Sequence, residues 1–149
     1  MKDENEIILR EVTKSDCEFL YELLKKREPL ASISHKKMPS YEEHVKFVLS
    51  KPYSKLYVVE YKNQKVGSAY ISKQDEIGIC VVKEFQGKGI DKKTTWLLMK
   101  KNPRSRYLAN VAPENHILQE FFKKLGFRGL QYTYEIINPQ IEQFLDEKN

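Results

Sequence analysis

The chain has 149 residues and a formal net charge of +5, and 40% of its residues are hydrophobic. This length and composition predict one folded domain over residues 1–149 and exclude disorder over most of the chain. A charged N-terminus without a long apolar run argues against a signal peptide or a membrane span, and the two cysteines suit a cytoplasmic protein. Neither the cysteines nor the three histidines have ligand spacing, so we expect no metal site.

Hydrophobic periodicity predicts strands and helices in a mixed order along the chain. An opening strand precedes two helices, each with a capping box at its start: Ser15 with Glu18, and Ser40 with Glu43. A hairpin, a short apolar strand and a helix that stops before Pro103 follow. One more strand, the clearest helix, closing strands and a tail helix complete the series. The expected segments are 6–12, 15–26, 40–50, 55–61, 65–72, 76–82, 88–101, 106–111, 113–126, 127–137 and 139–147. Such an order predicts an α/β or α+β sandwich with a mixed sheet.

Positive charge is concentrated in residues 83–106, which contain eight basic and two acidic residues. The rest of the chain is close to neutral. No continuous basic stripe with interleaved exposed aromatic residues appears, which argues against a nucleic-acid-binding protein. From charge alone, a solvated helix face and a site for a compact polyanion both remain open.

The segment QGKGIDKK, residues 86–93, lies within this basic region, between an apolar strand and a helix. A turn of this kind directs several main-chain N–H groups at one point, and the helix N-terminus adds a partial positive charge. Gly87 and Gly89 would let phosphate oxygens approach those amides closely. The spacing matches neither a Walker loop nor a full dinucleotide motif, and an ordinary helix entry has much the same pattern.

The longer segment VVKEFQGKGIDKKTTWLL resembles the first signature of the GNAT superfamily of acetyl-CoA-dependent N-acetyltransferases. The downstream segment NVAPENHILQEFFKKLGFRGL is similar to the second signature of that family, and ILREVTKSDCEFLYEL is typical of its opening. Together these matches span most of the chain in the expected order. The resemblance implies a GNAT-like α/β (α+β) fold, with a mixed, mostly antiparallel central sheet of six to seven strands flanked by about four helices.

The resemblance also implies where acetyl-CoA, the cosubstrate, binds. Main-chain groups of a central strand would pair with the pantetheine arm, amides of the glycine-bearing loop would hold the pyrophosphate, and an asparagine would bond the coenzyme further along. The cofactor-binding residues implied in this way are Cys80, Val81, Val82, Gln86, Gly87, Lys88, Gly89, Ile90, Asp91 and Asn115.

Two residues depart from the family pattern. Asp91 stands where the family prefers Gly or Ala, and its carboxylate would weaken acetyl-CoA binding unless it points outward. Phe122 stands where many members place the tyrosine that protonates the departing CoA thiolate. Phenylalanine has no proton to donate, and we expect Phe122 in the core. Another group or water must therefore act as the acid, or the protein binds acetyl-CoA without turning it over.

The acceptor amine must lose its proton before it attacks, because an ammonium group has a pKa of about 10. The resemblance implies a carboxylate at or near the strand before the loop, which makes Glu76 the candidate base. His44 is a second catalytic candidate, on the helix where the acceptor usually approaches. The simpler interpretations are an exposed turn carboxylate for Glu76, and for His44 a surface histidine beside Tyr41 and Val48.

The acceptor itself is the least determined part of the prediction. Glu43-His44 followed by Phe47 is weakly similar to family members that acetylate nucleotide-linked amino sugars, and the basic run at 35–37 would suit nucleotide phosphates. The predicted function is transfer of acetyl from acetyl-CoA to a primary amine, with an amino-sugar nucleotide as the acceptor that this likeness favours, by direct attack in a ternary complex. The alternatives are protein or peptide N-acetylation and a non-catalytic acetyl-CoA-binding module. We expect a small-molecule amine as partner, no nucleic acid or membrane, and a monomer or homodimer.

Overall fold

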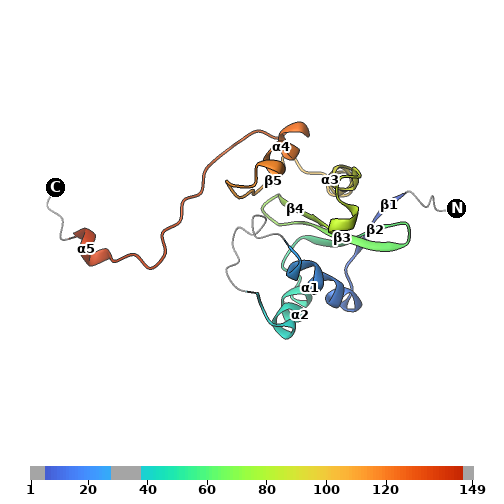
Figure 1. Cartoon of the computed structure of the whole chain (residues 1–149), viewed down its shortest axis with the longest axis horizontal. Coiled ribbons are helices and arrows are strands. Elements are labelled where there is room, and N and C mark those ends of the chain that lie inside the picture. Colours follow the sequence, from blue (N-terminus) through green and yellow to red (C-terminus); the bar gives the residue numbers. More distant parts are fainter. Residues whose placement is uncertain (1–5, 28–37, 146–149) are drawn as a thin grey trace.

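The computed structural model describes residues 6–27 and 38–145. Five strands form one sheet in the order β1-β2-β3-β4-β5 (Figure 1). Neighbours pair antiparallel from β1 to β4, whereas β5 pairs parallel with β4. The strands are β1 (Ile7–Glu11), β2 (Lys55–Tyr61), β3 (Gln64–Ile71), β4 (Glu76–Val81) and β5 (Leu108–Ala109).

Helices cover both faces of the sheet (Figure 1). One face carries α1 and α2, the other α3 and α4, and α5 lies at the end of an extended segment that leads away from the sheet. No helix in the described ranges is both long and apolar enough to cross a bilayer. The helices are α1 (Cys17–Lys25), α2 (Tyr41–Leu49), α3 (Ile90–Lys101), α4 (His116–Lys124) and α5 (Ile141–Leu145).

The predicted mixed α/β fold is confirmed, but the sheet of the described chain has five strands rather than six to seven. The closing strands expected over 127–137 are wrong, because residues 128–140 form no strand or helix and their side chains are exposed. Alternation of apolar and polar residues predicts which side chains of a strand would face the core. The strand forms only if it also finds the edge of another strand to pair with. The strand expected at 106–111 shrinks to β5 for a similar reason, since its pairing with β4 covers only two residues.

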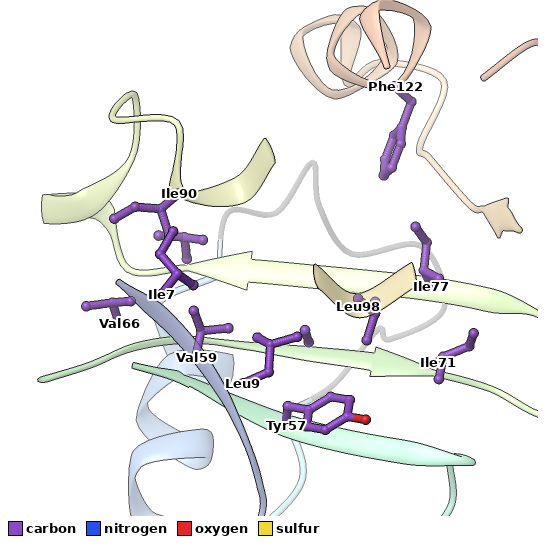
Figure 2. Packing of buried hydrophobic residues seen from close by; sticks show 12 residues of the cluster. Ile7, Leu9, Tyr57, Val59, Val66, Ile71, Ile77, Ile90, Leu98 and Phe122 are labelled. Carbon is purple, nitrogen blue, oxygen red and sulfur yellow. The ribbon is translucent and has the colours of Figure 1, made fainter. Parts of the chain in front are cut away.

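The main core lies between the sheet and the α3/α4 layer. Figure 2 shows Leu98 from α3 and Phe122 from α4 directed at the sheet, near Ile77 and Ile71. The Phe122 ring is 8% exposed and packs edge-to-face against Phe127, with ring centroids 5.0 Å apart. Its expected place in the core is therefore confirmed. A smaller cluster on the opposite face joins Cys17, Leu20 and Val48 beneath α1 and α2.

A buried carboxylate ties the start of α1 to the sheet. Asp16 is 1% exposed and accepts hydrogen bonds from the Arg10 guanidinium at 2.9 and 3.0 Å, and its carboxylate lies 2.8 Å from Lys65 Nζ. The hydrogen bond from Arg10 holds the pKa of the Asp16 carboxyl far below its usual range. The capping box here consists of Thr13 and Asp16, not Ser15 and Glu18 as the sequence suggested, whereas the box at Ser40 and Glu43 is confirmed.

Replacing Asp16 by Asn should lower the free energy of unfolding at pH 7 by about 2 kcal/mol, because two cations lose their shared anion while remaining partly in contact with water. Since folding lowers the pKa of this carboxyl, its contribution is complete above about pH 4, the usual range of an aspartate, and is lost as pH falls below it. Urea unfolding of both proteins at pH 7 and pH 3 checks this. An equal difference at the two pH values contradicts it, and Glu11→Gln, which breaks an exposed pair, should change nothing measurable.

Candidate active site

The sheet opens between β4 and β5. These two strands run parallel and pair only at Glu76 with Leu108 and at Ile77 with Ala109. Beyond Ile77, β4 continues to Val81 without β5 beside it. The unpaired edge of β4 beyond Ile77 is called the gap below, with its narrow end at the paired residues and its wide end at Val81.

Hydrogen bonds along β4 alternate between its two edges, as antiparallel pairing with β3 requires. The Val82 N–H donates to the Val66 carbonyl at 2.8 Å, and the Ser72 N–H donates to the Glu76 carbonyl at 2.8 Å. The even-numbered residues from 76 to 82 therefore turn their main-chain groups towards β3. The odd-numbered residues between them turn theirs towards β5.

This alternation decides which main-chain groups face the gap. The N–H and C=O of Ile79 and the N–H of Val81 lie on that edge, where no strand of the described chain pairs with them. The Val81 carbonyl accepts a hydrogen bond from Gln86 Nε2 at 3.0 Å. An extended ligand can bind to such an edge as an added strand does. Three residues of this strand were predicted to bind the coenzyme through their main chain. The register leaves Val81 facing the gap but turns the main chain of Cys80 and Val82 towards β3. It also places the main chain of Ile79, which was not predicted, at the gap.

The glycine-bearing loop follows at the wide end of the gap. Gly87 and Gly89 have φ of +78° and +79°, the left-handed region that favours glycine. A Cβ built on either glycine would have no atom within 4 Å, so both main chains border open space. Gly89 is the N-cap of α3 and its carbonyl accepts from the Lys93 N–H at 3.1 Å, so the helix begins with its free N–H groups at the loop.

Charge around the loop is mainly positive. Lys88, Lys92 and Lys93 are exposed, and Lys88 Nζ lies 5.2 Å from the centroid of the Phe85 ring. Asp91 lies in the first turn of α3 and is half-buried, and its carbonyl accepts a hydrogen bond from the Thr95 hydroxyl. The loop therefore combines free amides, a helix N-terminus and mobile cations, with one carboxylate among them.

Asn115, predicted to bond the coenzyme, caps α4. Its Oδ1 accepts a hydrogen bond from the Leu118 N–H at 3.1 Å, which satisfies one of the free donors at the helix start. Its Nδ2 remains available as a donor to a ligand.

The α1/α2 face of the gap carries two stacked tyrosines that the sequence analysis did not identify. Tyr70 stands opposite Gly78 in the β3–β4 pair, and a Cβ on Gly78 would lie 2.1 Å from Tyr70 Cε1. The Tyr70 ring therefore lies directly against the β4 main chain, which only glycine permits. Tyr53 stacks on it with centroids 4.1 Å apart, and burial raises the pKa of both hydroxyls.

Burial also raises the pKa of the Cys80 thiol, while the charge of Arg27 acts in the opposite direction on this thiol and on the Tyr70 hydroxyl. Arg27 is thus a cation on the same face of the sheet. Arg27 follows α1 and is far from β4 in the sequence. Its closeness to Tyr70 and Cys80 therefore could not be predicted from the sequence.

Glu76 begins β4 at the narrow end of the gap. It is half-buried, and its Oε2 accepts a hydrogen bond from the Asn110 amide, which follows β5. The Glu76 carboxylate thus links β4 to the residue after β5, next to the point where the two strands part. The charge of Glu76 also helps to raise the pKa of the Tyr70 hydroxyl. Asn110 is a second residue that the sequence analysis did not identify, because its partner is set by the parallel register.

His44, the other catalytic candidate, lies between α1 and α2. Its ring centroid is 5.3 Å from that of Tyr21, it is 7% exposed, and its Nε2 has no hydrogen-bond partner. Burial lowers the pKa of this histidine, so the ring is neutral at pH 7. It is not the surface histidine of the simpler interpretation. Within the described ranges, its ring packs on Tyr21 of α1 and its Nε2 forms no hydrogen bond to Glu76.

No group of three His, Cys, Asp or Glu side chains that could hold a metal ion occurs among residues 6–27 and 38–145. The basic run His35, Lys36 and Lys37, to which the sequence analysis assigned nucleotide phosphates, lies outside the described residues.

Comparison with known structures gives the same architecture. A domain from Methanocaldococcus jannaschii DSM 2661 superposes with a TM-score of 0.74 at 25% identity, over 87% of this chain and 93% of that one. RimL, a ribosomal L7/L12 alpha-N-protein acetyltransferase solved with coenzyme A, gives 0.72 at 21% identity, over 89% and 86%. AAC(6')-Iy with a CoA-linked acetylneamine bisubstrate analogue gives 0.69 at 17% identity, over 91% and 99%. At these identities the last two show the fold alone.

A search of curated proteins finds no significant match to this chain. The profile of the acetyltransferase (GNAT) family, in contrast, matches residues 17–127, which include the gap, the loop and both faces of the sheet. The chain therefore belongs to the GNAT family, the acetyl-CoA-dependent N-acetyltransferases that its sequence resembles.

Proposed function

We propose that this protein transfers the acetyl group of acetyl-CoA to the primary amine of a small molecule, by direct attack in a ternary complex. The observation that carries the proposal is the gap between β4 and β5, whose unpaired main-chain groups lead to a loop of open glycines at a helix N-terminus. An extended arm that ends in a diphosphate matches both parts of this arrangement.

Acetyl-CoA, when bound, supplies an acetyl group activated as a thioester. Ile79 and Val81 are proposed to hold the pantetheine arm through their main chain. The amides from Gln86 to Asp91 are proposed to hold the pyrophosphate, with the nearby lysines adding charge. Asn115 would contribute its Nδ2. This places the reactive end of the coenzyme at the narrow end of the gap, near Gly78.

Glu76 is proposed as the base that takes the proton from the acceptor ammonium. It lies where the strands part, and the Asn110 amide fixes one carboxylate oxygen while the other remains available as an acceptor. The neutral amine then forms the new C–N bond as the C–S bond breaks, the acylated nitrogen gives up its extra proton to become the neutral amide, and the departing thiolate takes up a proton. His44 stands as the second candidate, because its neutral ring has an unpartnered Nε2.

Tyr70 is proposed to supply the proton for the thiolate, in place of the tyrosine that Phe122 replaces. Its ring lies against Gly78, one residue from the main-chain groups of Ile79 that face the gap. Because burial raises its pKa, the hydroxyl stays protonated at neutral pH and can donate.

Tyr70→Phe should lower kcat about tenfold, because the ring and its stacking remain while the proton donor is lost. Steady-state rates at saturating acetyl-CoA and acceptor check this. Tyr53→Phe is the matched control, since it removes the hydroxyl from the other ring of the stack, and it should keep near-normal rates. Equal rates for Tyr70→Phe and the unaltered protein would show that Tyr70 does not protonate the CoA thiolate and would make water the proton donor.

Asp91→Gly should strengthen acetyl-CoA binding several-fold, because it removes a negative charge from the start of α3, where the pyrophosphate is proposed to bind. Titration calorimetry at low and high salt measures the effect, which should shrink as salt screens the repulsion. Asp91→Asn separates charge from size and should give most of the gain. Unchanged or weaker binding in both variants would mean that the carboxylate points away from the ligand.

An amino-sugar nucleotide is the acceptor we favour. Support comes from two aromatic side chains, Phe47 of α2 and Tyr53 just before β2. Phe47 is 48% exposed and packs edge-on against Tyr53, with ring centroids 6.0 Å apart. The faces of such rings can stack on a sugar ring or a nucleotide base. Binding of a polycation would instead need carboxylate side chains to pair with its charges. Thiol release from acetyl-CoA with UDP-amino sugars, peptides and polyamines tests the choice. Release with peptides alone would make the protein a peptide acetyltransferase, and binding without release for any amine would make it a non-catalytic module.

A further inference from the structure

Helix α3 carries two rows of side chains on opposite sides, one towards the sheet and one towards solvent. The inner row is buried and consists of Ile90, Thr94 and Leu98. The outer row is exposed and consists of Lys92, Trp96 and Lys100. Residues within each row are four apart, and the rows are offset by two residues, which is about 200° around the helix. Because Leu98 is directed at the sheet (Figure 2), the outer row faces away from it.

Trp96 is the apolar centre of the outer row. It is 46% exposed, whereas its neighbours Leu97 and Met99 pack against the core. A tryptophan at the middle of a charged surface is the arrangement found at the centre of many protein interfaces, where its large ring supplies much of the binding energy.

The lysines around Trp96 have no carboxylate partner of their own. Lys92 and Lys93 lie one turn before the ring and Lys100 one turn after it, and none of them forms an ion pair in the part of the chain that the structure describes. Like charges this close on a helix repel one another, so a partner that brings carboxylates is attracted. These three lysines and Trp96 are hereafter called the α3 ridge.

We propose that the α3 ridge docks an acidic helix of a partner protein. Along the axis of α3, Lys92 and Lys100 are about 12 Å apart, with Trp96 midway between them. A second helix packed along α3 matches this spacing when an apolar residue meets Trp96 and a carboxylate lies four residues to each side of it. The matching pattern is Glu-x-x-x-Leu-x-x-x-Glu. Since the gap lies in the sheet and the outer row faces away from it, docking does not depend on the proposed acetyl transfer.

The same surface is poorly suited to other occupants. A second copy that packed its own α3 here would oppose lysines with lysines. A helix that lies in a membrane interface needs a broad apolar face, whereas the other apolar residues of α3 are turned to the core. A nucleic acid duplex is bound through many phosphate contacts, which call for a longer basic surface than two helical turns.

Tryptophan fluorescence can measure docking directly, because Trp96 is the only tryptophan in the chain. The probe is a hydrocarbon-stapled helical alanine peptide with the Glu-x-x-x-Leu-x-x-x-Glu pattern, and the same peptide with Lys in place of both Glu is its charge control. The acidic peptide should shift the emission of the full chain to shorter wavelength in a saturable manner, because the ring leaves water. Binding should weaken as salt is raised, and the basic peptide should cause no shift.

Two variants of equal net charge show whether the ridge is the binding surface. Lys100→Glu changes the ridge lysine furthest from the glycine-bearing loop and should weaken binding of the acidic peptide about tenfold, because an attraction becomes a repulsion. Lys46→Glu is the matched control, since Lys46 is also exposed in the last turn of a helix but lies on the opposite face of the sheet (Figure 1). It should bind the peptide as the unaltered protein does. Circular dichroism melts check that both variants are folded.

The absence of a shift with the acidic peptide would overturn the proposal, as would equal affinities for Lys100→Glu and Lys46→Glu. Vesicles of phosphatidylserine with phosphatidylcholine, and duplex RNA, are titrated in the same way. A shift with either of these and none with the acidic peptide would assign the ridge to a membrane or to a nucleic acid instead.

Discussion

Replacing Glu76 by Gln is expected to lower kcat by about 10²- to 10³-fold, which lies within the range of about 10²- to 10⁴-fold that a positioned general base contributes. Glutamine keeps the size of the side chain and its contact with the Asn110 amide, so the start of β4 should stay in place. What is lost is the group that accepts the proton of the acceptor ammonium. The rate should recover partly as pH rises, because more of the acceptor is then already neutral. Steady-state rates between pH 7 and 10 measure both effects.

His44→Gln is the comparison that assigns the role. Its ring lies between α1 and α2, so we expect a loss of stability with less than tenfold change in kcat. Near-normal turnover in Glu76→Gln together with a large loss in His44→Gln would transfer the base to the histidine. Near-normal turnover in both variants would remove both residues from the chemistry.

Gly89→Ala is expected to raise the KM for acetyl-CoA about tenfold, equivalent to about 1.4 kcal/mol of binding. The Cβ would project into the open space beside the loop, where we propose that the diphosphate packs against the main chain. The same methyl strains the backbone at a φ of +79°, at a cost of roughly 1 kcal/mol of stability. Acceptor KM should change little, since the acceptor approaches from the other end of the gap.

Gly126→Ala serves as the matched control for backbone strain. Gly126 also has a positive φ, +102°, and a Cβ there would likewise meet no atom within 4 Å. It lies after α4, away from the loop, so this variant should lose stability without a change in the KM for acetyl-CoA. A similar rise in KM for both variants would attribute the effect to general strain, and no rise in Gly89→Ala would argue against a diphosphate at the loop.

The parts of the fold that the sequence predicts are those set by local pattern. Three elements can be predicted from residues within or next to them. They are α2, from its apolar stripe and capping box, α3, from Gly89 at its start, and β4, from its apolar run. Residues 127–137 cannot, because their alternating apolar residues predict a strand but say nothing about which edge it would pair with. Asp16 was missed for a related reason: its cations come from β1 and β3, which only folding brings together.

For the site, the loop was predictable and the face beside it was not. The positive φ angles of Gly87 and Gly89 follow from a glycine pattern that is visible in the sequence. The choice of Ile79 over Cys80 depends on the register of β3 against β4, and a shift of one residue would reverse it. The Tyr70–Gly78 contact depends on the same register, so neither residue stands out when the sequence is considered alone.

The two-residue pairing between β4 and β5 has a consequence for stability. With so few main-chain bonds across it, this joint should be where the molecule opens first, and its amides should exchange with solvent before those of β2 and β3. A coenzyme bound along both walls would close the joint and act as part of the scaffold. Acetyl-CoA at a hundred times its Kd should then stabilise the fold by about 2.7 kcal/mol, with the slowing of amide exchange centred on β4.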